Sequence, residues 1–198
     1  MFRPKRGNMK GKHRQVKKEA FSFGKFTNFP FLVHGLAKIS HDNTITKIQR
    51  SIIQTLYNLN GYKEAYPLSI ADHAGTRNGE FAFETGIADG MFFDFLDEET
   101  AGKLFDFLES GKEYSILDFL VIVTYHYLKE ERRTSLNFDH NILRFSFNEG
   151  IIEVLLFHSK GIRRMPLDDF LNKIINRIGL ETKCLGLKPI KVEKIRAL

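Results

Sequence analysis

The sequence has one cysteine, no tryptophan and no long apolar run. The single cysteine and the lack of a long apolar run each exclude a class of protein. A lone Cys184 cannot form an internal disulfide or a thiolate zinc site, and it fits a reducing compartment. The longest strongly apolar stretch, residues 119–123, is far too short to cross a bilayer, and residues 1–20 lack the apolar core of a secretory signal. We therefore expect a soluble, cytoplasmic protein with no membrane partner.

The remaining composition is that of a globular chain. Apolar residues make up 42% of the 198 positions and charged residues 27%, which excludes wholesale disorder and collagen-like repeats. Residues 1–20 contain few large apolar side chains and show no periodicity, so they cannot bury enough surface to become ordered. We expect a flexible basic arm over residues 1–20 and a single α+β domain over residues 21–198.

The net charge of +6 is unevenly distributed along the chain. Residues 1–20 hold eight Lys and Arg against Glu19, whereas residues 61–131 hold fifteen acids against five bases. Residues 132–198 are basic again, with thirteen Lys and Arg against seven acids. This segregation favours a polyanionic partner at the basic ends. It would also let a second copy pair its basic ends with the acidic middle, which would give a homo-oligomer.

Strand patterns come in hairpins. Asp89-Gly90 lies between two apolar segments and predicts a tight turn that pairs Ala88 with Met91. Asn148-Glu149-Gly150 predicts a second turn, between strands at 136–147 and 151–158, with a bulge near residues 139–141. The Phe-rich start of the domain and the alternating tail after residue 187 predict edge strands.

Helix patterns are interspersed among these hairpins. Apolar spacing and capping residues predict four helices, over residues 44–59, 98–109, 116–131 and 167–178. The third is apolar nearly all round, which is typical of a helix at the centre of a fold. We therefore predict a mainly antiparallel sheet built from hairpins, with about four helices packed on it.

The loop from His158 to Pro166 carries the most suggestive chemistry of the domain. It joins a strand to a helix start, where free N–H groups attract anions, and its Lys and Arg side chains would add bidentate contacts. Asp168 and Asp169 offer an alternative, because they could pair with the two arginines in a purely structural loop. The loop cations that we predict to contact phosphate are Lys160, Arg163 and Arg164.

The basic arm is the second candidate for phosphate contacts. Lysine-rich arms bind nucleic acid through counterion release without reading its sequence. A localisation signal, a solubilising tail or a docking arm for an acidic protein would have the same composition. The arm cations that we predict to bind nucleic acid are Arg3, Lys5, Arg6, Lys10, Lys12, Arg14, Lys17 and Lys18.

Catalytic and metal signals are weak. Asp139 and His140 could cluster with His158, and Asp72 and His73 with Glu84 and Asp89, but neither set has the ligand spacing of a known metal motif. Nucleophile elbows, phosphate-binding glycine loops and dinucleotide turns are missing from the sequence. We therefore predict no catalytic residue, no metal site and no cofactor.

These observations favour a non-enzymatic protein that binds the phosphate backbone of nucleic acid through the arm and the 158–166 loop. RNA is favoured over DNA, because the helix predicted at 44–59 exposes only Lys47 and Arg50 and so lacks a basic recognition face for a DNA groove. Two alternatives stay open: a small enzyme that uses the 158–166 loop for a phosphorylated or nucleotide substrate, and an adaptor whose arm docks on an acidic protein.

Overall fold

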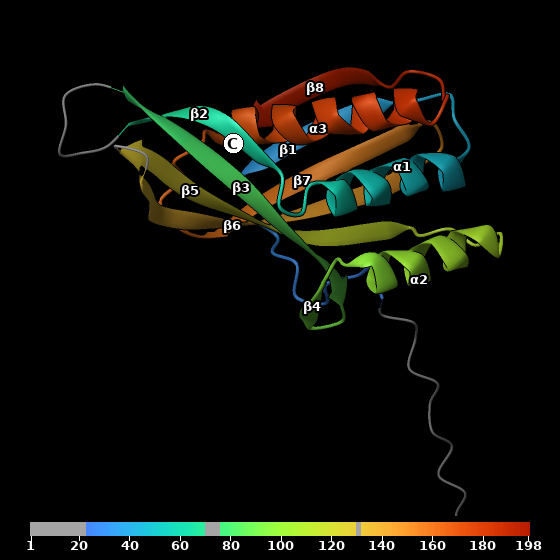
Figure 1. Ribbon diagram of the computed structural model, residues 1–198. Coiled ribbons are helices and arrows are strands. Elements are labelled where there is room, and N and C mark those ends of the chain that lie inside the picture. Colours follow the sequence, from blue (N-terminus) through green and yellow to red (C-terminus); the bar gives the residue numbers. More distant parts are fainter. Residues whose placement is uncertain (1–22, 70–75, 130–131) are drawn as a thin grey trace, which may run out of the picture.

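The computed structural model describes residues 23–69, 76–129 and 132–198. One antiparallel sheet curls into a half-barrel, and three helices of the described chain pack against its concave face (Figure 1). The helices are α1 (Ile45–Asn58), α2 (Glu98–Glu109) and α3 (Leu167–Cys184). The strands are β1 (Gly35–Ser40), β2 (Lys63–Ser69), β3 (Thr76–Asp89), β4 (Phe92–Phe95), β5 (Ile116–Lys129), β6 (Arg132–Asn148), β7 (Ile151–Lys160) and β8 (Lys191–Ala197).

The strands run in the order β2-β3-β5-β6-β7-β1-β8, and β4 folds back onto the end of β3. The concave face buries alternate side chains of the central strands, such as Phe83 of β3, Phe119 of β5 and Phe145 of β6. Helix α1 contacts both α2 and α3 and closes the core with one apolar stripe, which includes Ile48 and Ile52. The opposite face of the sheet carries no helix in the described chain, and we call it the open face.

The α+β class is confirmed, but the prediction of about four helices is wrong. Residues 116–131 were predicted as a helix, and the described part of this range, Ile116–Lys129, is the strand β5. Leu117, Phe119 and Val121 face the core, whereas Leu120 and Ile122 lie half-buried on the open face. Apolar character all round the segment therefore reflects a central strand with both faces partly covered. The β-branched residues in it favour a strand over a helix.

Two boundaries also differ from the predictions. Asp89 pairs with Phe92, so Gly90 and Met91 form the tight turn in place of Asp89-Gly90. Gly90 has a φ of +64°, as the first residue of a type II′ turn requires. Helix α3 continues past Gly179 to Cys184. The helices at 45–58 and 98–109 and the strand in the tail are confirmed. The bulge predicted near residues 139–141 is wrong for β6: the register shift at His140 has its extra residue, Ser159, in β7, and the extra residue of β6 lies between Ser135 and Phe138.

Part of the open face is covered by the segment that precedes β1, residues 23–34. Gly24 bridges two strands, because its N–H donates to Ala88 O (2.7 Å) and its carbonyl accepts from Asp118 N (2.7 Å). Phe26 N donates to Asp118 Oδ2 (2.7 Å), and Arg144 donates to Phe26 O (3.1 Å). Arg144 also forms a short ion pair with Asp118 and lies 4.0 Å from the centre of the Phe29 ring. One buried ion pair thus holds this segment to the sheet.

A buried amide joins α1 to the loop before β5. Gln49 is fully buried; its Nε2 donates to Tyr114 O (2.6 Å) and its Oε1 accepts from Tyr114 N (3.0 Å). The substitution Gln49→Leu leaves both backbone groups without a partner and is expected to lower the free energy of unfolding by about 1–3 kcal/mol. Urea denaturation measures this loss. Gln54→Leu, which removes only an exposed hydrogen bond to Asn58, is the control and should change stability far less.

Candidate nucleic-acid interface

The loop between β7 and α3 is fixed by one buried carboxylate, Asp139 of β6. Its Oδ1 accepts from the backbone N–H of Arg163 (2.8 Å), and its Oδ2 accepts from the N–H of Arg164 (3.0 Å). Tyr125 Oη donates to Oδ2 (2.8 Å), and His158 Nε2 lies 3.3 Å from Oδ1. We call this arrangement the Asp139 clamp. It satisfies two loop N–H groups with charge-assisted hydrogen bonds and so determines where the loop cations stand.

The electrostatics of the clamp favour an ionised carboxylate. Burial by itself would raise the pKa of Asp139, but the hydrogen bonds from Tyr125, Arg163 N, His158 and Arg164 N prevail and hold the pKa below its ordinary value of 3.8. Burial, together with the neighbouring Asp139 carboxylate, raises the pKa of Tyr125, which keeps its hydroxyl protonated. Tyr125 Oη also accepts a hydrogen bond from Met165 N (3.2 Å), which extends the clamp to the start of α3.

The backbone of the loop adopts an unusual conformation at Gly161 and Arg163, both of which lie against Asp139. Arg163 is the one described non-glycine residue with a positive φ, at +54°. Gly161 has a φ of +111°, and a Cβ atom there would lie 2.1 Å from Asp139 Oδ1. The close approach of Gly161 to the carboxylate therefore requires glycine. The result is a constrained loop that presents Lys160, Ile162 and Arg163 to solvent.

On the open face, the neighbours of Asp139 along β6 form an aromatic and basic cluster. Because successive strand residues point to opposite faces, Phe138 and His140 lie on the open face while Asp139 points inward. The Phe138 ring is 40% exposed and lies 4.9 Å from the His140 ring. Lys160 Nζ stands 5.1 Å from the centre of the Phe138 ring. We call Phe138, His140 and Lys160 the stacking cluster.

The histidines around this cluster are less basic than usual. Burial and the charge of Lys160 lower the pKa of His140, and burial together with the charge of Arg163 lowers the pKa of His34. His34 accepts a hydrogen bond from His158 N through Nδ1 (3.0 Å) and stacks on Phe157 with ring centres 4.9 Å apart. A neutral imidazole presents a flat face for stacking, while the permanent charge of the surface comes from Lys160 and the arginines.

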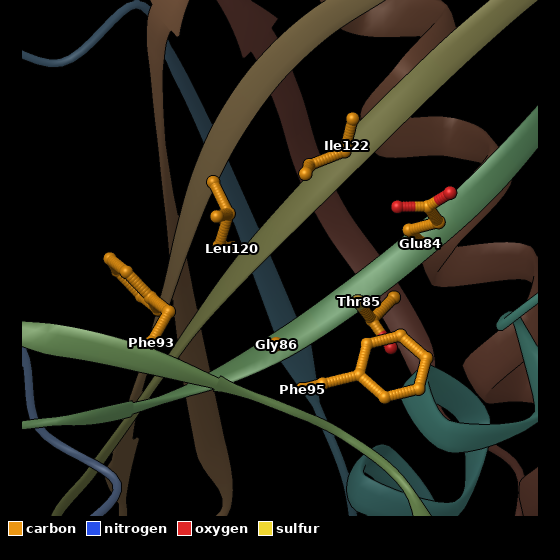
Figure 2. Close-up of a pocket in the computed structure, with 7 residues that line it drawn as sticks. All are labelled: Glu84, Thr85, Gly86, Phe93, Phe95, Leu120 and Ile122. Atoms are coloured by element: carbon orange, nitrogen blue, oxygen red, sulfur yellow. The ribbon is translucent and has the colours of Figure 1, made fainter.

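A pocket of about 150 Å³ adjoins the stacking cluster on the open face. Strand register places Glu84, Ile122, His140 and Lys160 in one row across β3, β5, β6 and β7. Figure 2 shows Phe93 and Phe95 on either side of Gly86, with Leu120 and Ile122 along the neighbouring strand. Glu84 lies further along β3 from Gly86 and supplies the pocket's carboxylate.

The structure brings together some of the predicted site residues and leaves others apart. Lys160 and Arg163 lie in one constrained loop with Arg164, as their sequence positions suggest. The eight arm cations lie outside the described residues, as do Asp72 and His73. Among the described aromatics that follow the arm, Phe26 packs against Phe93, with ring centres 4.8 Å apart.

The sequence analysis did not identify Asp139 as the anchor of the loop and offered Asp168 and Asp169 only as an alternative that could pair with the arginines. It also did not predict that Phe138 and His140 lie together on the open face. The available signal was the grouping of Asp139 with His158, since His158 Nε2 does lie 3.3 Å from Asp139 Oδ1. The Asp139–His158 contact resembles a catalytic pair, but both carboxylate oxygens accept hydrogen bonds that fix the loop, and His158 is 8% exposed.

Among the described residues, His, Cys, Asp and Glu form no group of three that could hold a metal ion. None of the described helices combines the length and apolar character needed to cross a bilayer. Comparison of the sequence with protein-family models, curated proteins and solved structures found no match.

Proposed function

We propose that this protein binds single-stranded nucleic acid, with RNA favoured, on the open face of its sheet. Unpaired bases stack on Phe138 and His140, and the phosphates contact Lys160, Arg163 and Arg164. The basic arm, residues 1–20, adds affinity that does not depend on sequence. Such a surface combines the two elements of sequence-tolerant single-strand binding, which are aromatic platforms and a cationic track along the backbone.

The observation that carries the proposal is the stacking cluster. An aromatic ring that is 40% exposed, with a lysine ammonium 5.1 Å from its centre, leaves apolar surface uncovered beside a positive charge. The face of a base covers such a ring, and the adjoining phosphate pairs with the ammonium. The Asp139 clamp supports the same function, because it holds the loop cations in place before a ligand arrives and so reduces the entropy lost on binding.

A single strand is favoured over a duplex because the described helices lack a free basic face. On α3, Lys173 and Arg177 both pair with Glu64 of β2. On α1, Arg50 pairs with Glu109 of α2. A DNA-reading helix needs such side chains for base edges and phosphates. The open sheet face instead suits bases that are already unstacked.

The first experiment measures binding of single- and double-stranded RNA and DNA by fluorescence anisotropy over a salt series. We expect single-stranded RNA to bind most tightly, with an affinity that falls as salt rises. Deletion of residues 1–20 should lower affinity for every nucleic acid and flatten the salt dependence. Equal affinity for single strands and duplexes would contradict stacking, and binding that does not respond to salt would contradict phosphate contact.

Loss of the stacking ring tests the open face directly. Phe138→Ala is expected to weaken single-strand binding by about 1–3 kcal/mol, which is the usual contribution of one stacked base. Phe92→Ala is a matched control, because Phe92 is 75% exposed but lies on β4, away from the loop. If both variants bind as tightly as the natural sequence, the bases do not stack at residue 138.

Loss of the loop charges should change the salt dependence of binding. Lys160→Gln and Arg163→Gln should each reduce the slope of log affinity against log salt by about 0.7, the value for one phosphate contact on a single strand. Lys103→Gln serves as the control, because Lys103 lies on α2 and pairs with Glu99. An unchanged slope in the loop variants would show that phosphates do not contact these two residues.

A further inference from the structure

The pocket beside the stacking cluster has a chemical composition that the proposed function does not explain. Its walls are the rings of Phe93 and Phe95 and the aliphatic side chains of Leu120 and Ile122. Gly86 lets β4 pass close to β3 at the pocket, since a Cβ atom there would lie 2.9 Å from Asp94 O. Flat, apolar walls beside a surface that stacks aromatic groups suit a second base.

Glu84 is the distinctive polar group of this pocket. The backbone of Thr85 is paired on both sides, with Asn60 Oδ1 (2.6 Å) and with Leu96 N (3.0 Å). The Thr85 hydroxyl points to the helix side and donates to Leu56 O (2.8 Å). The Glu84 carboxylate, in contrast, makes no hydrogen bond or ion pair within the described residues. It is therefore an acceptor with two free oxygens beside an apolar pocket.

A base that meets this carboxylate must present donors. Guanine offers two adjacent donors, N1–H and the exocyclic N2 amine, which match the two carboxylate oxygens. Uracil offers one N–H between two carbonyl oxygens, and those oxygens would face the carboxylate unfavourably. Adenine and cytosine each place a ring nitrogen acceptor beside their amine. The matched pair of donors and acceptors singles out guanine, because bidentate pairing gives both energy and geometric selectivity.

The distribution of charge also determines how the nucleic-acid strand lies on the open face. The pocket is built from β3, β4 and β5, which belong to the acidic stretch of the chain, whereas Lys160 and Arg163 stand at the end of β7 and beyond it. Phosphates are therefore repelled near the acidic pocket and attracted by Lys160 and Arg163. Adjacent strands are about 4.8 Å apart, so the pocket and the stacking cluster lie within reach of neighbouring nucleotides. The phosphate backbone of the nucleic acid therefore follows β6 and β7, while one base extends across the sheet to β3.

We propose that the pocket of Glu84, Phe93, Phe95, Leu120 and Ile122 binds a guanine base through two hydrogen bonds to the Glu84 carboxylate. This inference rests on the proposed function and adds a base preference to it. It predicts that binding of a short single strand depends on whether one nucleotide in it is guanosine.

The experiment compares three RNA hexamers with the full-length protein at low salt: all uridine, uridine with one guanosine, and uridine with one inosine. The guanosine hexamer should bind roughly tenfold more tightly than the uridine hexamer. Inosine keeps N1–H but lacks the N2 amine, so its hexamer should have an intermediate affinity. Glu84→Gln should abolish the guanosine preference while leaving the uridine affinity unchanged or higher, because it removes one negative charge.

Glu149→Gln, an exposed acid in the β6–β7 turn, is the matched control and should keep the preference. The outcomes separate the two proposals. If the hexamers bind with equal affinity, the guanine pocket is wrong and the proposed function stands. If Glu84→Gln lowers the affinity for all three alike, Glu84 does not read the base. If no hexamer binds, the proposed function fails and the base preference fails with it.

Discussion

Asp139→Ala should lower the free energy of unfolding by about 3–5 kcal/mol, the usual cost of removing one member of a buried charged network. The carboxylate is 2% exposed and accepts hydrogen bonds from Tyr125, His158 and two loop amides. Without it, these donors remain in the core with no acceptor. Chemical denaturation at neutral pH measures the loss. Asp168→Ala, an exposed acid at the start of α3, is the control and should cost less than about 1 kcal/mol.

Asp139→Asn removes the negative charge of the side chain but keeps its shape. An amide that replaces Oδ2 would point N–H groups at Tyr125 and at the N–H of Arg164, so we expect a loss nearly as large as that of alanine. In both variants the loop loses its anchor, and single-strand affinity should fall together with stability. A stable Asp139→Asn protein that binds as before would show that the carboxylate does not position the loop.

The same carboxylate predicts an acid sensitivity. Since the pKa of Asp139 is lower in the folded protein than its ordinary value of 3.8, its contribution to stability is fully present above that value. The contribution is lost as the pH falls from about 4 through the lower folded-state pKa. Denaturation between pH 5 and 2, compared with Asp139→Ala, should show the two proteins converging as the pH falls, at about pH 4 and below.

Arg144→Met is the second substitution with a large expected effect. It leaves Asp118, whose side chain is fully buried, without its cation, and we expect a loss of about 3–5 kcal/mol. Residues 23–34 also lose the hydrogen bond to Phe26 O and the contact with Phe29. Urea denaturation measures the stability. Limited proteolysis should show faster cleavage within residues 23–34 than in the natural sequence.

Arg50→Met is the control, since it breaks an ion pair of the same length in an exposed setting. Arg50 lies 2.7 Å from Glu109, but the two side chains are 41% and 63% exposed. Water screens such a pair, and its loss should cost less than about 1 kcal/mol. Similar losses in the two variants would show that burial does not strengthen the dependence of Asp118 on Arg144.

Local sequence signals predicted some elements well and others poorly. Helix α2 begins and ends where the pattern placed it, because Asp97 accepts from Thr100 N (2.8 Å) and Gly111 follows its end. Strand β5 was mistaken for a helix, since a segment that is apolar at nearly every position shows no clear period. Only its neighbours β3 and β6, which cover its two edges, identify it as the centre of a sheet.

The sequence predicted only those residues of the candidate site that are close together along the chain. Lys160, Arg163 and Arg164 are neighbours along the chain, so their clustering needed no knowledge of the fold. The role of Asp139 depends on a pairing of β6 with β7 that brings residue 139 under residues 163 and 164. The pocket requires β4 to pack on β3 in one register, and the predicted register would have placed Phe93 beside Gly86. The two registers differ by two residues, so both keep Phe93 and Phe95 on the open face, but only the observed register brings Phe95 beside Gly86.

The position of β1 governs how this chain is able to fold. β1 is the first strand of the described chain, yet its partners are β7 and β8, so Gly35 pairs with Leu156 and with Ala197. On the ribosome, β1 emerges long before either partner, so it can pair on one side only after β7 has left the exit tunnel and on the other side only after β8 has. Contacts between such distant parts of a chain form slowly. Completion of the sheet is therefore a late step of folding, and truncation within β8 exposes one edge of β1.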